Sequence, residues 1–184
     1  NLAKEIGESW VMWPRQLVQN VRDILNHDDI VALDNWLYKV WFARNYKTFE
    51  ANTLLLDNAL ATMGAWLASG MEAKILHPEK SVVVITWDWG LVMNLWDLET
   101  AVRLNLDITV VVLNNASYGM IKWKQVGANM PMWGLDFGNP DFVKLAESFW
   151  GKWYKVQNKH EFQETLRRVN EEKWLKIIDL DFDY

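Results

Sequence analysis

The chain has 184 residues, enough for one domain with a substantial core. Its net charge of −5 gives a nucleic-acid partner no electrostatic support, and no apolar run approaches the roughly 20 residues that span a bilayer. Without cysteine it has neither disulfides nor thiolate metal sites. The start carries no signal-peptide pattern, so we expect a cytoplasmic protein. Because the chain begins at Asn1, we also expect it to be part of a longer polypeptide.

Strand-like and helix-like patterns alternate along the chain. The expected elements are a helix over 15–26, strands over 29–34 and 53–57, a helix over 63–76, a strand over 81–86, a helix over 91–104, a strand over 108–115, a helix within 139–149, a helix over 161–172 and a strand over 175–182. Continuous apolar strands between helices predict an α/β fold, a three-layer α/β/α arrangement with a mostly parallel sheet of about six strands. We expect residues 13–184 to form this domain, and residues 1–12 to be a linker or the tail of a preceding domain.

Polar residues follow several of these strands, where parallel sheets bind their ligands. They are Asp34, Asp57, Asp88, Asn114 and Asn115. Asp88 and Asn115 are separated by about one strand–helix–strand unit, so on neighbouring strands they would face one crevice. A carboxylate and an amide oxygen placed in this way suit Mg²⁺. The alternative is that both are ordinary turn residues.

The sequence around these two residues resembles a known signature motif. The stretch "WDWG…LNN" is similar to the motif of thiamine-diphosphate (ThDP) enzymes, which begins Gly-Asp-Gly and ends in an Asn pair. The segments "LDNALATMGAWLASGMEAK", "DLETAVRLNLDITVVVLNNASYGMIKWKQ", "LDFGNPDFVKLAESF" and "KIIDLDFDY" resemble the ThDP-binding C-terminal domain of acetolactate synthase large subunits. The resemblance covers roughly residues 14–184 and is closest to the catabolic type.

The resemblance implies a set of binding residues. Mg²⁺ would be bound by the side chains of Asp88 and Asn115 and by the backbone carbonyl of Ser117. Gly90, at the start of the following helix, would offer backbone N–H groups to the diphosphate. The full implied cofactor-binding set is Met63, Asp88, Trp89, Gly90, Asn115, Ser117, Tyr118, Gly119 and Met120.

Three further residues take their expected roles from the same resemblance. Met120 would wedge under ThDP, and Met63 would lie beside its aminopyrimidine ring. Plain core packing is the alternative for both methionines. Tyr38 stands where many relatives have a histidine near the diphosphate.

The resemblance also implies an activity and partners. The reaction would be decarboxylation of pyruvate, or of another 2-oxo acid, and carboligation to 2-acetolactate in branched-chain amino acid biosynthesis. The activating glutamate belongs to another domain on a partner subunit, so we expect no catalytic residue here, and a homodimer or homotetramer. Alternatives are a pyruvate oxidase or another carboligase, and a non-catalytic domain that lost the cofactor. A flavodoxin-like nucleotide-binding domain is a third reading, opposed by the absence of a G-x-G-x-x-G turn.

The tryptophan content is anomalous. The chain has 13 tryptophans and only nine glycines, whereas average usage predicts about 13 glycines. Against the family pattern, six tryptophans stand where relatives usually have glycine, which permits positive φ and close backbone approach: Trp36, Trp66, Trp87, Trp89, Trp150 and Trp153. Trp41 and Trp123 stand where the family tolerates an aromatic residue, whereas Trp174 has no assigned counterpart. Our hypothesis is that UGA codons read as glycine in the cell are written here as tryptophan. A designed or mutated chain with a blocked cofactor site is the alternative.

Overall fold

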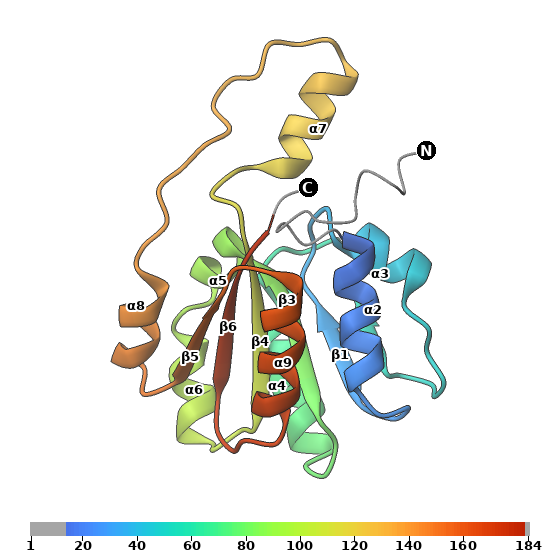
Figure 1. Ribbon diagram of the computed structural model, residues 1–184, viewed down its shortest axis with the longest axis vertical. Coiled ribbons are helices and arrows are strands. Elements are labelled where there is room, and N and C mark those ends of the chain that lie inside the picture. Colours follow the sequence, from blue (N-terminus) through green and yellow to red (C-terminus); the bar gives the residue numbers. More distant parts are fainter. Residues whose placement is uncertain (1–13, 183–184) are drawn as a thin grey trace.

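Six parallel strands form one sheet in the order β2-β1-β3-β4-β6-β5 (Figure 1). The computed structural model describes residues 14–182, so the predicted linker or tail over 1–12 lies outside the described residues. The strands are β1 (Ile30–Leu33), β2 (Leu54–Leu56), β3 (Val82–Trp87), β4 (Ile108–Asn114), β5 (Lys152–Val156) and β6 (Lys176–Asp181). The predicted α/β class and the number of strands are confirmed, and the sheet is entirely parallel.

Helices cover both faces of the sheet. They are α2 (Pro14–Ile24), α3 (Lys39–Asn45), α4 (Ala65–Leu76), α5 (Asp88–Met93), α6 (Asp97–Arg103), α7 (Gly119–Gly127), α8 (Phe142–Ser148) and α9 (Lys159–Asn170). One core cluster joins α2, α3 and α9 to one face, and a second joins α4, α5, α6 and α8 to the other. Successive side chains of β3 alternate between the clusters, as a strand buried on both faces requires: Val83 and Ile85 enter the first, and Val82 and Val84 the second.

Several boundaries differ from the sequence prediction. The single helix expected over 91–104 is wrong: it is two helices separated at residues 94–96, and the first begins at Asp88, directly after β3. The helix after Asn139 begins only at Phe142, because the Asp141 carboxylate caps it by accepting from Lys144 N at 3.2 Å. The prediction missed the helices α3 and α7 and the edge strand β5. In β5, charged and aromatic residues alternate, so the strand lacks the apolar run of a central strand.

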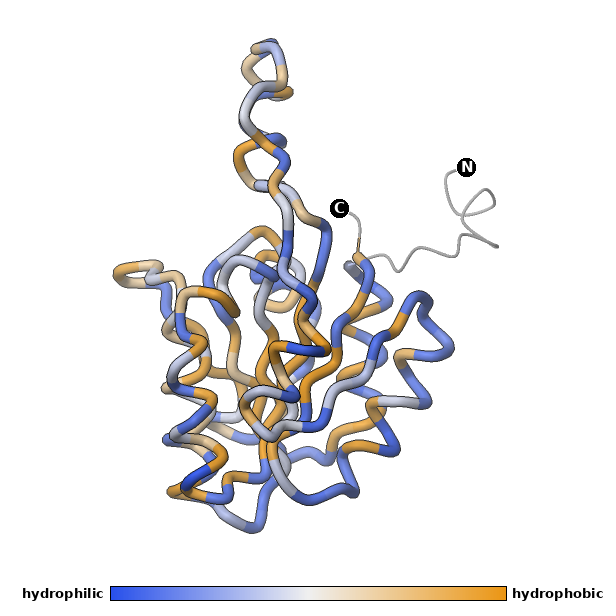
Figure 2. The backbone as a smooth tube through the Cα atoms, turned by 90° about the vertical axis from the view of Figure 1, so that its left-hand side faces the viewer, coloured by the Kyte–Doolittle hydropathy of each residue, from blue (hydrophilic) through white to orange (hydrophobic). Residues whose placement is uncertain are grey.

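Helix α7 and the loop after it project from the carboxyl-end side of the sheet (Figures 1 and 2). Only Gly119 of this helix is buried. Large apolar side chains are exposed along the projection, among them Trp123, Val126, Met130, Met132 and Trp133. Within residues 14–182, no helix is both long enough and apolar enough to cross a membrane.

Tyr38 belongs to the core. Its side chain is fully buried, and its hydroxyl donates to the Ile85 carbonyl oxygen at 2.8 Å. We expect Tyr38→Phe to lower the free energy of unfolding by about 1 kcal/mol, because Ile85 O keeps the Asp34 N–H as a donor. Urea denaturation measures this change. A loss above roughly 3 kcal/mol would contradict this description and indicate a larger polar role for the hydroxyl.

Candidate functional site

The carboxyl ends of β1 and β3 mark the place where connections diverge to opposite sides of the sheet. From β1 the chain continues to its neighbour β2, and from β3 to β4 on the other side. Ligands of open parallel sheets bind in the crevice at such a switch point. Asp34 directly follows β1, Trp87 ends β3, and Asp88 begins α5. The fold therefore directs attention to these residues and to the start of the loop after β4.

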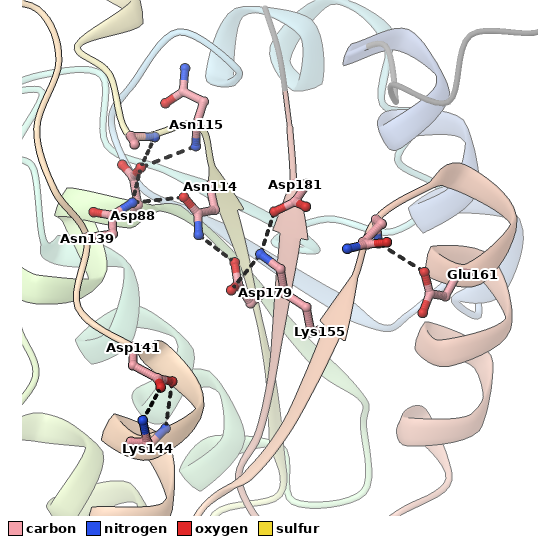
Figure 3. Close-up of polar contacts among 12 residues, drawn as sticks. Asp88, Asn114, Asn115, Asn139, Asp141, Lys144, Lys155, Glu161, Asp179 and Asp181 are labelled. Atoms are coloured by element: carbon pink, nitrogen blue, oxygen red, sulfur yellow. Dashed lines mark hydrogen bonds and ion pairs between the residues drawn. The ribbon is translucent and has the colours of Figure 1, made fainter.

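Asp88 is completely buried and accepts four hydrogen bonds. Those from Asn115 and Asn139 can be followed in Figure 3. Asp88 Oδ1 accepts from Trp89 N at 2.8 Å. Its Oδ2 accepts from Asn115 N at 3.2 Å, from Ala116 N at 2.8 Å and from Asn139 Nδ2 at 2.9 Å. This carboxylate therefore fastens the loop after β4 to the first turn of α5.

Asp88 and Asn115 lie together, as expected from neighbouring strands, but the contact differs from the one expected. The Asn115 main-chain N–H, and not its amide, meets the Asp88 carboxylate. The amide points away (Figure 3), and its Oδ1 accepts from Ser117 N at 3.3 Å. The Ser117 carbonyl oxygen accepts from Gly119 N at 2.9 Å. The amide and carbonyl oxygens of the predicted metal site thus lie in the stretch directly after β4, and the Asp88 carboxylate reaches the main chain of that stretch from the start of α5.

A polar network that sequence reasoning missed continues from Asp88 across the sheet (Figure 3). Asn139 Nδ2 also donates to Asn114 Oδ1 at 2.8 Å, and Asn114 Nδ2 donates to Asp179 Oδ1 at 2.9 Å. Lys155 Nζ donates to Asp179 Oδ2 at 3.0 Å. Burial raises the pKa of the Asp179 carboxyl, and the hydrogen bonds from Asn114 and Lys155 oppose that rise. The sequence pattern at Asn139-Pro140 predicts only a nearby helix and gives no signal that Asn139 contacts Asp88.

The other residues of the predicted set are distributed around this centre. Gly90 is buried in α5, and Trp89 is half-buried with its ring 5.4 Å from Phe137. Tyr118, Gly119 and Met120 follow at the start of α7. Met63 directly precedes the left-handed Gly64 and is 43% exposed. Met120 is also partly exposed, so neither methionine is fully buried in the core.

A cavity of about 880 Å³ lies between α3 and α7, beside the end of β4. Two residues of the predicted set, Asn115 and Gly119, line it. Apolar side chains of both helices form most of the remaining wall, with charge from Arg44 and Lys122. The cavity offers room for a ligand directly adjoining the Asp88 centre.

Asp34 is a second fully buried carboxylate at this edge. Its Oδ1 accepts from Gly64 N at 2.7 Å, and its Oδ2 accepts from Thr86 Oγ1 at 3.2 Å. Burial raises the pKa of the Asp34 carboxyl, and the hydrogen bonds from Asn35, Gly64 and Thr86 oppose that rise. Asp34 therefore links the ends of β1 and β3 to the start of α4.

Two tryptophans fill the crevice at the switch point. The rings of Trp36 and Trp87 are stacked, with centroids 4.0 Å apart and planes 4° apart. Trp87 is 2% exposed, and its indole lies against Gly90, where a methyl group would be only 2.6 Å from the ring. Trp66 is fully buried on the other face and donates from Nε1 to Gly90 O at 3.0 Å.

The residues present fit the metal ion that accompanies the implied cofactor, but they do not fit its diphosphate. Asp88, Asn115 and Ser117 supply carboxylate, amide and carbonyl oxygens, the donor types that Mg²⁺ prefers. Within residues 14–182 no group of three or more His, Cys, Asp or Glu could hold a metal ion, so a metal here would rely on neutral oxygens as well. The Trp36–Trp87 stack, however, occupies the crevice beside Gly90. As written, the chain does not fit a diphosphate at this place.

Comparison with known proteins defines the class. Residues 37–180 match the family model described as "Thiamine pyrophosphate enzyme, C-terminal TPP binding domain". The chain belongs to this family.

Individual relatives agree with this assignment. The chain is 30% identical over 171 residues to the acetolactate synthase of Bacillus subtilis (strain 168), covering 93% of this chain and 30% of that protein. It is 27% identical over 175 residues to the catabolic acetolactate synthase of Raoultella terrigena, covering 95% of this chain and 31% of that protein. The chain therefore spans about a third of the length of these relatives.

A solved structure with the same fold is the thiamine diphosphate-dependent 4-hydroxybenzoylformate decarboxylase of Rhodococcus jostii RHA1. It superposes with a TM-score of 0.85 at 20% identity, covering 97% of this chain and 34% of that one. At this identity the likeness concerns the fold alone. The predicted resemblance and fold are both confirmed.

Proposed function

We propose that this chain is the Mg²⁺- and ThDP-binding domain of an acetolactate-synthase-like enzyme, which decarboxylates pyruvate and joins the product to a second pyruvate as 2-acetolactate. The observation that carries the proposal is the buried Asp88 carboxylate, joined to the main chain of Asn115 and Ala116 at the carboxyl ends of neighbouring strands. The identities of about 30% to acetolactate synthases favour this member of the family.

In this proposal each residue of the centre has a defined task. Asp88, Asn115 and the Ser117 carbonyl hold the metal ion, which would supply positive charge to the phosphates. Asn139 holds Asp88 in place through its amide N–H group. Tyr118, Gly119 and Met120 border the binding space at the start of α7, and Gly119 also lines the neighbouring cavity. The enzyme would act as a homodimer or homotetramer, with its activating glutamate supplied from outside this domain.

A second candidate function is a non-catalytic domain that kept the fold and lost the cofactor. The Trp36–Trp87 stack favours it, because two indoles fill the crevice at the switch point, where open parallel sheets bind their ligands. The two candidates make opposite predictions for binding of ThDP.

The test is a calorimetric titration of ThDP into the full-length protein purified from the cells that produce it, with Mg²⁺ and then with EDTA. We expect binding that EDTA abolishes, because ThDP would be held through the metal and, under the UGA hypothesis, glycine at positions 36 and 87 would leave the crevice open in this protein. The same preparation should release 2-acetolactate from pyruvate. Absence of Mg²⁺-dependent binding would favour the non-catalytic domain, and turnover of a different 2-oxo acid would reassign the substrate.

A further inference from the structure

The backbone dihedral angles set two tryptophans apart from the others in the described part of the chain. Seven residues other than glycine have positive φ within residues 14–182, and two of them are Trp150, with φ of 57°, and Trp174, with φ of 81°. The other five are asparagine or alanine. Asparagine tolerates this region, but a bulky side chain there is a genuine outlier. Both tryptophan positions therefore have the backbone of a glycine.

The surroundings of Trp150 show why the backbone turns there. Helix α8 ends at Ser148 with Phe149 as its C-cap, so Trp150 is the first residue beyond the cap. Trp150 N donates to Glu147 O at 3.1 Å, and Gly151 N donates to Ala146 O at 3.1 Å. This pair of hydrogen bonds is the Schellman motif, whose left-handed residue is usually glycine. The Trp150 side chain is 78% exposed, so packing gives no reason for the indole.

Trp174 occupies the short connection between α9 and β6. Its φ of 81° is close to that of Gly64, the N-cap of α4, at 87°. The Trp174 side chain is 54% exposed. The family pattern does not assign this position to glycine. The backbone therefore adds Trp174 to the tryptophan positions that have the conformation of a glycine.

Unpaired indole N–H groups point to further positions. Within the described residues, four buried side-chain polar atoms have no hydrogen-bond partner, and three of these are the Nε1 atoms of Trp36, Trp87 and Trp153. The Trp87 N–H lies beside the Asp34 carboxylate without the geometry of a hydrogen bond. Buried N–H groups are normally paired, because an unpaired group loses its hydration without compensation. Trp66 is different, since its N–H donates to Gly90 O.

We infer that positions 36, 87, 150, 153 and 174 are glycine in the protein that the cell makes, because UGA codons are decoded there as glycine. Trp150 and Trp174 have a left-handed backbone that a bulky side chain rarely adopts, and Trp36, Trp87 and Trp153 each bury an indole N–H without a partner. The chain is also short of glycine. Trp96, Trp123 and Trp133 have exposed side chains and neither feature, so they remain tryptophan. This inference rests on backbone and hydrogen-bond geometry and holds whether or not the domain binds ThDP.

Peptide mass spectrometry of the protein purified from its own cells tests the inference directly. We expect glycine at the five positions and tryptophan at 96, 123 and 133. Tryptophan at 150 and 174 in the native protein would overturn it. Because the readout is covalent mass, it is independent of cofactor binding, and a failure of the proposed function leaves it unaffected.

A second measurement uses the full-length protein expressed with tryptophan at each position where the printed sequence has tryptophan. We expect Trp150→Gly and Trp174→Gly each to raise the urea midpoint of unfolding, because glycine relieves the left-handed backbone at both sites. Trp96→Gly is the matched control, since Trp96 is 83% exposed with φ of −67° and should not be stabilised by the change. A lowered midpoint for both Trp150→Gly and Trp174→Gly would overturn the assignment.

Discussion

Replacement of Asp88 by alanine should lower the free energy of unfolding by at least about 3 kcal/mol. The change removes the acceptor of the Trp89, Asn115 and Ala116 main-chain N–H groups at a buried side chain, and each orphaned donor costs roughly 1–3 kcal/mol. Asn139 Nδ2 loses one of its two acceptors and keeps Asn114 Oδ1. Urea denaturation of the full-length protein measures the loss. Asp136→Ala is the control, because Asp136 has an exposed side chain in the same region and should change stability by no more than about 0.5 kcal/mol.

The Asn115→Ala variant distinguishes an effect on metal-dependent ThDP binding from an effect on stability. The Asn115 main-chain N–H keeps its bond to Asp88 in this variant, and only the 3.3 Å bond from Ser117 N to the amide is lost. We therefore expect a stability change of about 1 kcal/mol or less, together with a large loss of Mg²⁺-dependent ThDP affinity. Unchanged affinity in Asn115→Ala would show that this amide is not a ligand. Unchanged stability in Asp88→Ala would contradict the anchoring role of the carboxylate.

The double variant Trp36→Gly/Trp87→Gly should gain ThDP binding in the protein expressed with every written tryptophan. Removal of the stack empties the crevice beside Gly90 and, without ligand, lowers stability because a void is left in the core. With Mg²⁺ present, ThDP at 100 times its Kd should then raise the free energy of unfolding by about 2.7 kcal/mol. Thermal unfolding with and without ThDP measures this gain.

The control for this experiment is Trp96→Gly/Trp133→Gly. Both side chains are 83% exposed and neither belongs to the stack, so the double change removes as much indole without opening the crevice. We expect no response to ThDP in the control. A folded Trp36→Gly/Trp87→Gly protein that ThDP fails to stabilise would mean that these indoles are not what excludes the cofactor.

Much of the fold was predictable because it is written in local patterns. Apolar β-branched runs specified β3 and β4, and the length of one crossover placed Asp88 near Asn115. The edge strand β5 and the break between α5 and α6 were not predictable in this way. An edge strand is defined by its partner, here β6, and its own alternation is weak.

Sequence alone determined the parallel sheet and the edge at which Asp88 and Asn115 meet, because periodicity and chain connectivity are sufficient for these, and the resemblance of its motifs gave the family. Tertiary structure decided which groups meet. Asn139 reaches Asp88 across 51 residues, and the Asn115 amide turns away from it, since hydrogen bonds between distant segments depend on packing that no local pattern encodes. The same holds for the left-handed backbone of Trp174, which is set by the path from α9 into β6 and identifies a glycine position without any family pattern.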